Sequence, residues 1–194
     1  MANDTRARML ETAARLLRQR GYHGMAVSDV LVESGAPRGS LYFHFPGGKD
    51  QLVLEATRDA IDQATAALRQ ALAAEKTPAR GVRVFVEHAA QLLEESDYTF
   101  GCPVAPVILD ASGGVADLEE LCRRAFEEWV GILQATFVAA GIPQRRARPL
   151  ALLVESSIEG VLLIGRSYRD SSVLMTVAIE LEAIVAAACR SARR

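Results

Sequence analysis

The chain has 194 residues, of which 50% are hydrophobic, 24% are charged and 6% are aromatic. This length and composition are typical of a soluble folded protein with a hydrophobic core, and they argue against a disordered chain. The net charge of −2 gives no general sign of nucleic-acid binding, but residues 1–49 hold seven Lys or Arg against four Asp or Glu, which leaves a basic excess at the N-terminal end.

Apolar residues recur at helical spacing along almost the whole chain, and no segment alternates as a strand would. We therefore predict an all-α fold of about nine helices. The first helix is expected from about residue 4 to residue 20, with Gly21 as its C-cap. Its apolar face comprises Met9, Leu10, Ala13, Leu16 and Leu17.

Two short helices are predicted next, on either side of a glycine turn. Ser28 is expected to cap the first of them, which runs through Glu33, and Gly35 is expected to supply the positive φ that ends it. Because proline is tolerated in the first turn of a helix, the second can span residues 37–44. The Pro46-Gly47-Gly48 segment then ends it.

A long fourth helix is expected from Lys49 to about Ala74, with Leu54, Ile61, Leu68 and Leu72 along it. The remaining helices are expected over residues 77–94, in a short piece that ends before Ser112-Gly113-Gly114, and over residues 115–140, 144–168 and 172–190.

The segment from Val27 to Phe45 is typical of a helix-turn-helix. Val30, Ala36 and Leu41 can form its small core, which leaves the second helix exposed for a DNA groove. Lys49 opens the next helix, where free N–H groups favour a phosphate. The expected DNA-binding residues are Ser28, Pro37, Arg38, Gly39, Ser40, Tyr42, Phe43, His44 and Lys49. The alternative is that the SLYFHF run is a core-forming helix end with Tyr42, Phe43 and Phe45 buried.

The glycine turn, the GSLYFHF run and Lys49 resemble the TetR family of transcriptional regulators, and PRGSLYFHFPGGK with GCPVAPVILDAS resembles its LmrA/YxaF-like branch. The resemblance implies Arg38 and Ser40 near bases, with Tyr42, His44 and Lys49 near phosphates. This sequence departs from the family pattern at Met25-Ala26, at Leu31 and in an extra glycine before Lys49.

The resemblance also implies two domains, a helix-turn-helix DNA-binding domain over residues 1–48 and a ligand-binding and dimerisation domain over residues 49–194. The last two helices carry apolar residues on two sides, so we predict that they form a four-helix interface with a second copy. A thick monomeric core is the alternative. The expected interface residues are Leu150, Val154, Ser157, Ile158, Val161, Val177, Leu181, Ile184 and Val185.

Most of the aromatic residues gather in the middle of the chain, around a loop broken by glycine and proline, where they can line a cavity for a small hydrophobic or aromatic effector. Ordinary core packing is the alternative. Glu155 and Glu159 can orient such a ligand, or instead form a solvated edge. The expected ligand-binding residues are Phe85, His88, Tyr98, Phe100, Cys122, Phe126, Trp129, Phe137, Glu155 and Glu159.

The function expected from these patterns is a DNA-binding repressor that binds a near-palindromic operator as a homodimer and is released by the effector. The alternatives are an effector-independent DNA-binding protein and a helical enzyme. The three histidines and three cysteines show no catalytic or metal-ligand spacing, so we expect no enzyme activity, cofactor or metal. No signal peptide or membrane-spanning stretch is expected, which favours a reducing cytoplasm.

Overall fold

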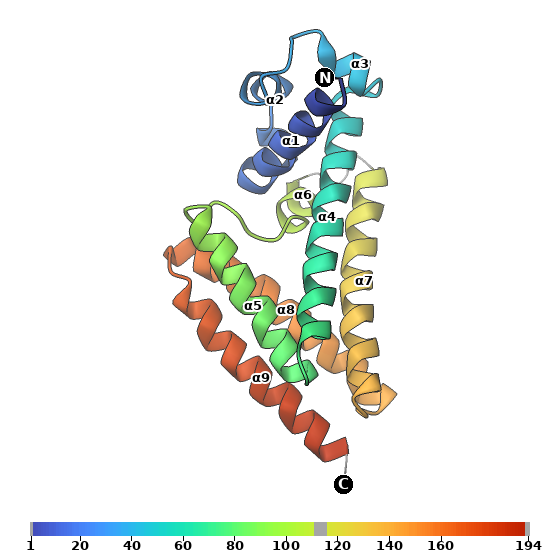
Figure 1. Cartoon of the computed structure of the whole chain (residues 1–194), viewed down its shortest axis with the longest axis vertical. Coiled ribbons are helices and arrows are strands. Elements are labelled where there is room, and N and C mark those ends of the chain that lie inside the picture. Colours follow the sequence, from blue (N-terminus) through green and yellow to red (C-terminus); the bar gives the residue numbers. More distant parts are fainter. Residues whose placement is uncertain (1, 111–115, 193–194) are drawn as a thin grey trace. The chain divides into compact units, whose positions relative to one another are not determined.

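The computed structural model describes residues 2–110 and 116–192, and within these ranges it contains nine helices and no strand (Figure 1). The predicted all-α fold is confirmed. The predicted Ser112-Gly113-Gly114 turn lies outside the described residues. The helices are α1 Ala2–Gly24, α2 Val27–Glu33, α3 Ser40–His44, α4 Gly48–Ala74, α5 Pro78–Glu95, α6 Ala105–Asp110, α7 Ala116–Ala139, α8 Gln144–Tyr168 and α9 Ser172–Ala192.

Contacts divide the chain into two units. Unit 1 is Met1–Gln63 with Cys102–Ala125, and unit 2 is Ala64–Gly101 with Phe126–Arg194. Two of the three boundaries between the units therefore fall inside α4 and α7, and the third falls in the loop between α5 and α6. A domain boundary at residue 48 stays a prediction.

Unit 1 is built on the apolar face of α1. All five residues predicted for this face are buried, because their spacing of three and four places them on one side of the helix. The backbone leaves helical geometry at Gly21 (φ 71°), where the sequence predicted the helix to end, and a further turn follows as far as Gly24. The carboxylate of Asp110 in α6 lies against Gly21 and accepts a hydrogen bond from the backbone N–H of His23. This contact ties α6 to the end of α1.

In unit 2, α9 packs on both α5 and α8, and α5 also packs on α8. The hydroxyl of Thr77 caps α5 by accepting the Arg80 N–H at 3.2 Å, with Pro78 in the first helical position. α8 ends at Arg169, which is in the left-handed conformation (φ 53°). The chain then turns directly into α9, which runs back along α8 (Figure 1).

By length and composition alone, α9 (Ser172–Ala192) is apolar enough to cross a membrane. It is not an uninterrupted apolar stretch, because it contains Glu180 and Glu182. One side of this helix carries the buried residues Leu174, Ala178, Leu181 and Val185. Its other side also carries apolar residues, including the exposed Ile179 and Ile184. A helix that is apolar on two sides needs cover on both.

Candidate nucleic-acid interface

The turn between α2 and α3 is held by backbone hydrogen bonds around Gly35. The N–H of Ala36 donates to the carbonyl of Leu31 (3.0 Å) and the N–H of Gly35 donates to Val32 (3.2 Å), a Schellman motif that requires a left-handed residue after the cap. Gly35 has φ 65°, a conformation that glycine adopts without the strain a Cβ would bring. The predicted role of Gly35 is confirmed.

The predicted cap of α2 is wrong. The helix begins at Val27, and the carbonyl of Ala26 accepts from the N–H groups of Asp29 (3.1 Å) and Val30 (3.3 Å). Ala26 has no hydroxyl, so no side chain caps this helix. Ser28 is exposed and its hydroxyl contacts only Asp29, at 3.5 Å, among the hydrogen bonds of the described ranges. Its hydroxyl is therefore available for a phosphate oxygen.

The third helix is shorter than predicted, because it starts at Ser40 rather than Pro37. The N–H of Ser40 donates to the carbonyl of Pro37 (2.9 Å), which closes a turn through Arg38 and Gly39. Glycine is a poor helix former, so this turn does not join the helix. The Ser40 hydroxyl also donates to the Pro37 carbonyl, at 2.7 Å. Pro37, Arg38 and Gly39 are all exposed, and Ser40 is half-buried.

Helix α3 has one buried and one exposed side. Leu41 and Phe45 lie four residues apart and are both buried, so they pack α3 and the residue that follows it into the core. Tyr42 and Phe43 point outward, with 71% and 76% of their surface exposed, and His44 between these sides is half-buried. The alternative of a wholly buried SLYFHF run is right for Phe45 and wrong for Tyr42 and Phe43. Two large exposed rings on one short helix indicate a binding surface.

The acidic residues of α2 form ion pairs with arginines of α1. Asp29 pairs with Arg20 at 2.8 Å, and Glu33 pairs with Arg15. Arg38, by contrast, forms no ion pair with any residue in the described ranges. The surface that includes Arg38, Tyr42 and Phe43 thus keeps a positive charge that is not neutralised.

Lys49 is held in place by two residues that the sequence analysis did not identify. Its ammonium group lies 4.5 Å from the centre of the Tyr22 ring, and the Tyr22 hydroxyl donates to Asp50 at 2.5 Å. This hydrogen bond is the main cause that raises the pKa of Tyr22 to about 12. The only sign of this role in the sequence is an aromatic residue, Tyr22, directly after Gly21. Apolar periodicity predicts no helix at that position, so Tyr22 falls between two predicted helices. Tyr22 orients Lys49 without removing its charge.

The predicted ligand-binding residues are divided between the two units. Cys122 belongs to unit 1 and the other nine belong to unit 2. His88 is exposed on α5, and the Tyr98 ring lies under the Arg169 guanidinium, 5.4 Å from its centre. Burial raises the pKa of the Cys122 thiol to about 11, which leaves it protonated and unreactive at neutral pH.

Trp129 has the most specific surroundings in this group. Its indole N–H donates to the hydroxyl of Thr65 in α4 at 2.8 Å, and both side chains are buried. Phe126 meets the indole edge-on, with 5.5 Å between ring centres. Phe137 is fully buried, whereas Phe85 and Phe100 are half-buried. Thr65 was missed because a lone threonine in a helix gives no sign of its partner.

Glu155 lies in the interior of unit 2 and is only 8% exposed. Burial is the main cause that raises its pKa from 4.5 to about 8, and the nearby charge of Glu159 adds to this effect. Glu155 is therefore mainly protonated at neutral pH in the folded chain.

We expect the free energy of unfolding to decrease as the pH rises from about 4.5 to about 8. The unfolded chain loses the Glu155 proton near pH 4.5, whereas the folded chain keeps it until about pH 8. Glu155→Gln should remove this pH dependence and raise the stability at neutral pH by on the order of 3 kcal/mol. Urea unfolding between pH 5 and pH 8 measures the effect, and Glu159→Gln should keep most of the slope. An unchanged slope in Glu155→Gln would contradict this assignment.

The predicted dimer residues need correction, because six of the nine face the core of a single chain. Ser157 and Val177 are half-buried and Ile184 is exposed. The other six are already covered by their own chain, since α8 and α9 turn these sides toward each other and toward α5. They are Leu150, Val154, Ile158, Val161, Leu181 and Val185.

Seven of the thirteen exposed large hydrophobic side chains in the described ranges lie on α8 and α9. On α8 they follow one stripe, in which Ser156 and Gly160 separate the larger residues. A Cβ added to Gly160 would meet no atom within 4 Å, so the stripe is open at that point. The seven are Leu152, Leu153, Leu163, Ile164, Tyr168, Ile179 and Ile184.

Two family models match the chain. The model for the bacterial regulatory proteins of the tetR family matches residues 9–56, which include α2, the turn and α3. The model for the LmrA/YxaF-like transcriptional regulator C-terminal domain matches residues 78–180.

Similar proteins cover nearly the whole chain. An HTH-type transcriptional regulator of Mycobacterium tuberculosis, Rv0196, is 37% identical over 94% of both chains. The HTH-type transcriptional regulator LmrA of Bacillus subtilis is 30% identical over 90% of this chain and 93% of its own. Among solved structures, a TetR transcriptional regulator from Chloroflexus aurantiacus is 25% identical, covers 95% of this chain and 96% of its own, and superposes with a TM-score of 0.82.

Proposed function

Since this chain belongs to the TetR family of DNA-binding transcriptional regulators, we propose that it is a repressor that binds a near-palindromic operator as a dimer and leaves it when a small hydrophobic effector binds. It acts in the cytoplasm, where the DNA lies. The roles of the individual residues below are part of this proposal.

One observation carries the proposal: the unpaired charge of Arg38 and the exposed rings of Tyr42 and Phe43 all fall within residues 38–43, at the second helix of a helix-turn-helix. Arg38 lies in the backbone turn before α3, and its side chain is long enough and has enough donors to bind the edge of a guanine. Ser40 also lies near the bases. Tyr42, His44 and Ser28 contact phosphates, and Lys49 anchors the backbone at the start of α4. Phe43 packs against a sugar or a thymine methyl group.

The exposed apolar stripe of α8 and the outer side of α9 supply the dimer interface. Water-exposed leucines such as Leu152 and Leu163 are costly unless a partner covers them, and Gly160 lets two helices approach closely. A two-fold dimer places its two reading helices about 34 Å apart, so the two half-sites lie one helical turn apart.

The effector binds in unit 2, beside Trp129 and Phe126. A ligand hydroxyl or ring that takes the place of Thr65 as partner of the Trp129 N–H breaks a contact of α4. The same helix carries Lys49 at its start. In unit 1, the contact of Asp110 with Gly21 passes any shift of α6 to α1. The effector releases DNA because it binds more tightly to the conformation in which the reading helices are misplaced.

A mobility-shift titration with the DNA upstream of the protein's own gene tests this function. We expect binding to a near-palindromic site that weakens steeply with salt, because phosphate contacts release counterions. The single tryptophan of the chain, Trp129, reports effector binding by its fluorescence, and Trp129→Phe is the matched control. A panel of small aromatic compounds is screened for this signal, and the positive compounds are added to the protein–DNA complex.

The outcomes separate the alternatives. Release of DNA by a compound that changes the Trp129 emission supports the repressor proposed here. Saturable operator binding that no such compound relieves favours an effector-independent DNA-binding protein and overturns the effector part. Binding without sequence preference overturns the operator itself.

A further inference from the structure

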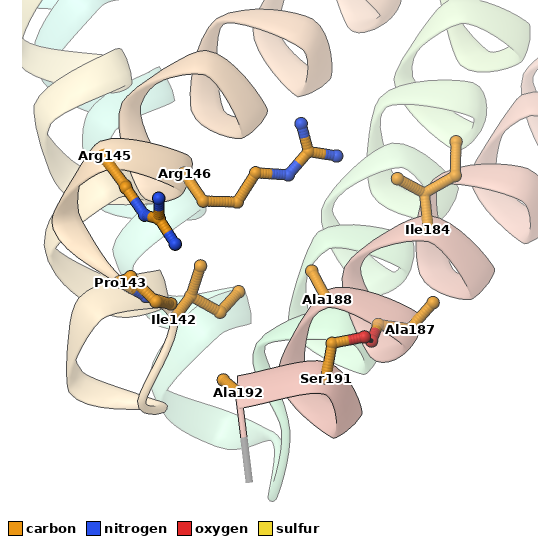
Figure 2. A pocket seen from close by; sticks show the side chains of 9 residues that line it. All are labelled: Ile142, Pro143, Arg145, Arg146, Ile184, Ala187, Ala188, Ser191 and Ala192. Carbon is orange, nitrogen blue, oxygen red and sulfur yellow. Dashed lines mark hydrogen bonds between the residues drawn. The ribbon is translucent and has the colours of Figure 1, made fainter. Parts of the chain in front are cut away.

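A pocket of about 680 Å³ in unit 2 belongs to the face that we assign to the dimer. It lies between the first turn of α8 and the last turns of α9, and Figure 2 shows Arg146 on one side of it and Ile184 and Ala188 on the other. Ile184 is one of the exposed apolar residues on the outer side of α9. Because a second copy covers this side of α9 in the proposed dimer, the pocket is no separate site.

The turn between α3 and α4, in unit 1, contains the glycine that is extra to the family pattern. Two glycines, Gly47 and Gly48, precede Lys49. Gly48 is left-handed (φ 67°), and its N–H donates to the carbonyl of Phe45 at 2.8 Å. Glycine leaves the backbone more freedom than any other residue, so a turn of two glycines needs other contacts to fix its geometry.

Gln51, near the start of α4, supplies one of these contacts. Its side-chain carbonyl accepts the N–H of Gly47, the residue before the helix, at 2.8 Å. The approach is close, because a Cβ on Gly47 would lie 3.1 Å from the Cβ of Gln51. A side chain that reaches back in this way satisfies a free N–H group at the start of a helix and fixes the backbone there.

Gln51 is itself held by Glu55 and Arg6. Its amide group donates to one oxygen of the Glu55 carboxylate at 2.8 Å, and the other oxygen pairs with the guanidinium of Arg6 in α1. The same guanidinium lies 5.1 Å from the centre of the Phe45 ring, at the end of α3. All three polar side chains are half-buried, which limits the competition from water. A continuous set of contacts thus runs from α1 to the glycine turn.

The charge of Arg6 is used inside the chain rather than on its surface. Arg6 belongs to the basic excess of the first 49 residues, but Glu55 neutralises it. Arg38, by contrast, forms no ion pair in the described ranges. Arg6 therefore contributes geometry to the helix-turn-helix, whereas Arg38 keeps its charge for a ligand.

The glycine turn also contacts Tyr42. A Cβ on Gly48 would lie 3.4 Å from a ring carbon of Tyr42, so the ring packs against the backbone of the turn. The ring is 71% exposed, so this backbone is one of the few contacts that can hold it. The position of the turn therefore influences the direction of the Tyr42 side chain.

We propose that Gln51, supported by Glu55 and Arg6, is a positioning residue for DNA binding, which fixes the Gly47-Gly48 turn and acts through Tyr42. None of the three supporting side chains needs to touch DNA. The inference rests on the proposed function in one respect, the role of Tyr42 as a phosphate contact.

Gln51→Ala is expected to weaken DNA binding by about tenfold, because the hydrogen bonds that hold the turn are lost. Fluorescence anisotropy measures the Kd for a duplex of the DNA upstream of the gene and for a scrambled duplex. Both should be affected alike, since a phosphate contact carries no base information. Alanine is a strong helix former, so the Tm should stay within about 4 °C of that of the unmodified chain.

The matched control exchanges the two side chains in the double variant Gln51→Glu/Glu55→Gln. The net charge is unchanged, and all three contacts can form again: the new carboxylate accepts the Gly47 N–H and the new amide, whose carbonyl accepts the Arg6 guanidinium. Its Kd should lie within about threefold of that of the unmodified chain. By NMR, the Gly47 amide should exchange with solvent faster in Gln51→Ala and slowly again in the exchange variant.

A double-mutant cycle tests whether Gln51 acts through Tyr42. If it does, Gln51→Ala combined with Tyr42→Ala should bind within about twofold of the weaker single variant. Ser28→Ala is the matched partner, because Ser28 is another proposed phosphate contact but lies on α2. Its loss should multiply with that of Gln51→Ala. A residue that only stabilises the fold would give the same loss in both combinations.

Three results would overturn the inference: unchanged binding by Gln51→Ala, losses of Gln51→Ala and Tyr42→Ala that multiply fully, or an exchange variant that binds as weakly as Gln51→Ala. The proposed function fails in a different way. A chain that does not prefer the upstream duplex over the scrambled one has no operator there, yet the effect of Gln51→Ala is still measured on both duplexes.

Discussion

Arg38→Ala is expected to weaken binding to the preferred operator by about 10- to 100-fold, because a bidentate arginine contact contributes about 1–3 kcal/mol of base discrimination. Arg38 is exposed and unpaired, and it lies in a turn outside the helix ladder, so its loss should not disturb the fold. Binding to unrelated DNA should change far less. Fluorescence anisotropy with the operator and with a scrambled duplex measures both affinities.

Lys49→Ala provides the contrast that makes this result specific. A phosphate contact carries no base information, so this variant should weaken binding to both duplexes alike and lower the salt slope by about one. Arg58→Ala is the control for charge alone, since Arg58 is exposed on the same helix as Lys49. Equal losses on both duplexes for Arg38→Ala would show that this arginine does not read bases.

Leu163→Glu is expected to dissociate the dimer and, as a consequence, to reduce operator binding by about a thousandfold, because a buried charge at an apolar interface has no partner. Leu163 is 71% exposed on the α8 stripe, so the substitution should leave the single chain folded. Sedimentation velocity measures the oligomeric state, and circular dichroism measures helix content.

The matched control for this prediction is Leu109→Glu. Leu109 is 81% exposed, but it lies on α6 in unit 1 and does not belong to the stripe on α8. This variant should remain dimeric. If Leu163→Glu also remains dimeric while Leu150→Ala unfolds the chain, then α8 supports only the core of one chain and the interface lies elsewhere.

The sequence alone determined the features that depend on neighbours along the chain. The spacing of Met9, Leu16 and Leu17 defines a buried helix face wherever the helix packs. Gly35 ends α2 and Thr77 begins α5 through hydrogen bonds to residues within five positions. The all-α fold and the helix-turn-helix follow from the same local rules.

The start of α3 and the cap of α2 show the limit of those rules. Ser28 is suited to cap α2, but the helix begins one residue earlier, with the Ala26 carbonyl as the first acceptor. Pro37 is suited to begin α3, but it instead begins a turn through Gly39 that precedes the helix. Such choices differ by about 1 kcal/mol, which is too small to decide from propensities.

The tertiary structure alone decided which side of each apolar helix is covered. Periodicity cannot distinguish the sides of α8, because both carry large apolar residues, and only its contacts with α9 and α5 assign Val154 to the core and Leu163 to the surface. The same holds for α3, where the packing of Phe45 turns Phe43 outward. The physical reason is that hydrophobic burial is not directional, so the partner that removes a side chain from water determines its role.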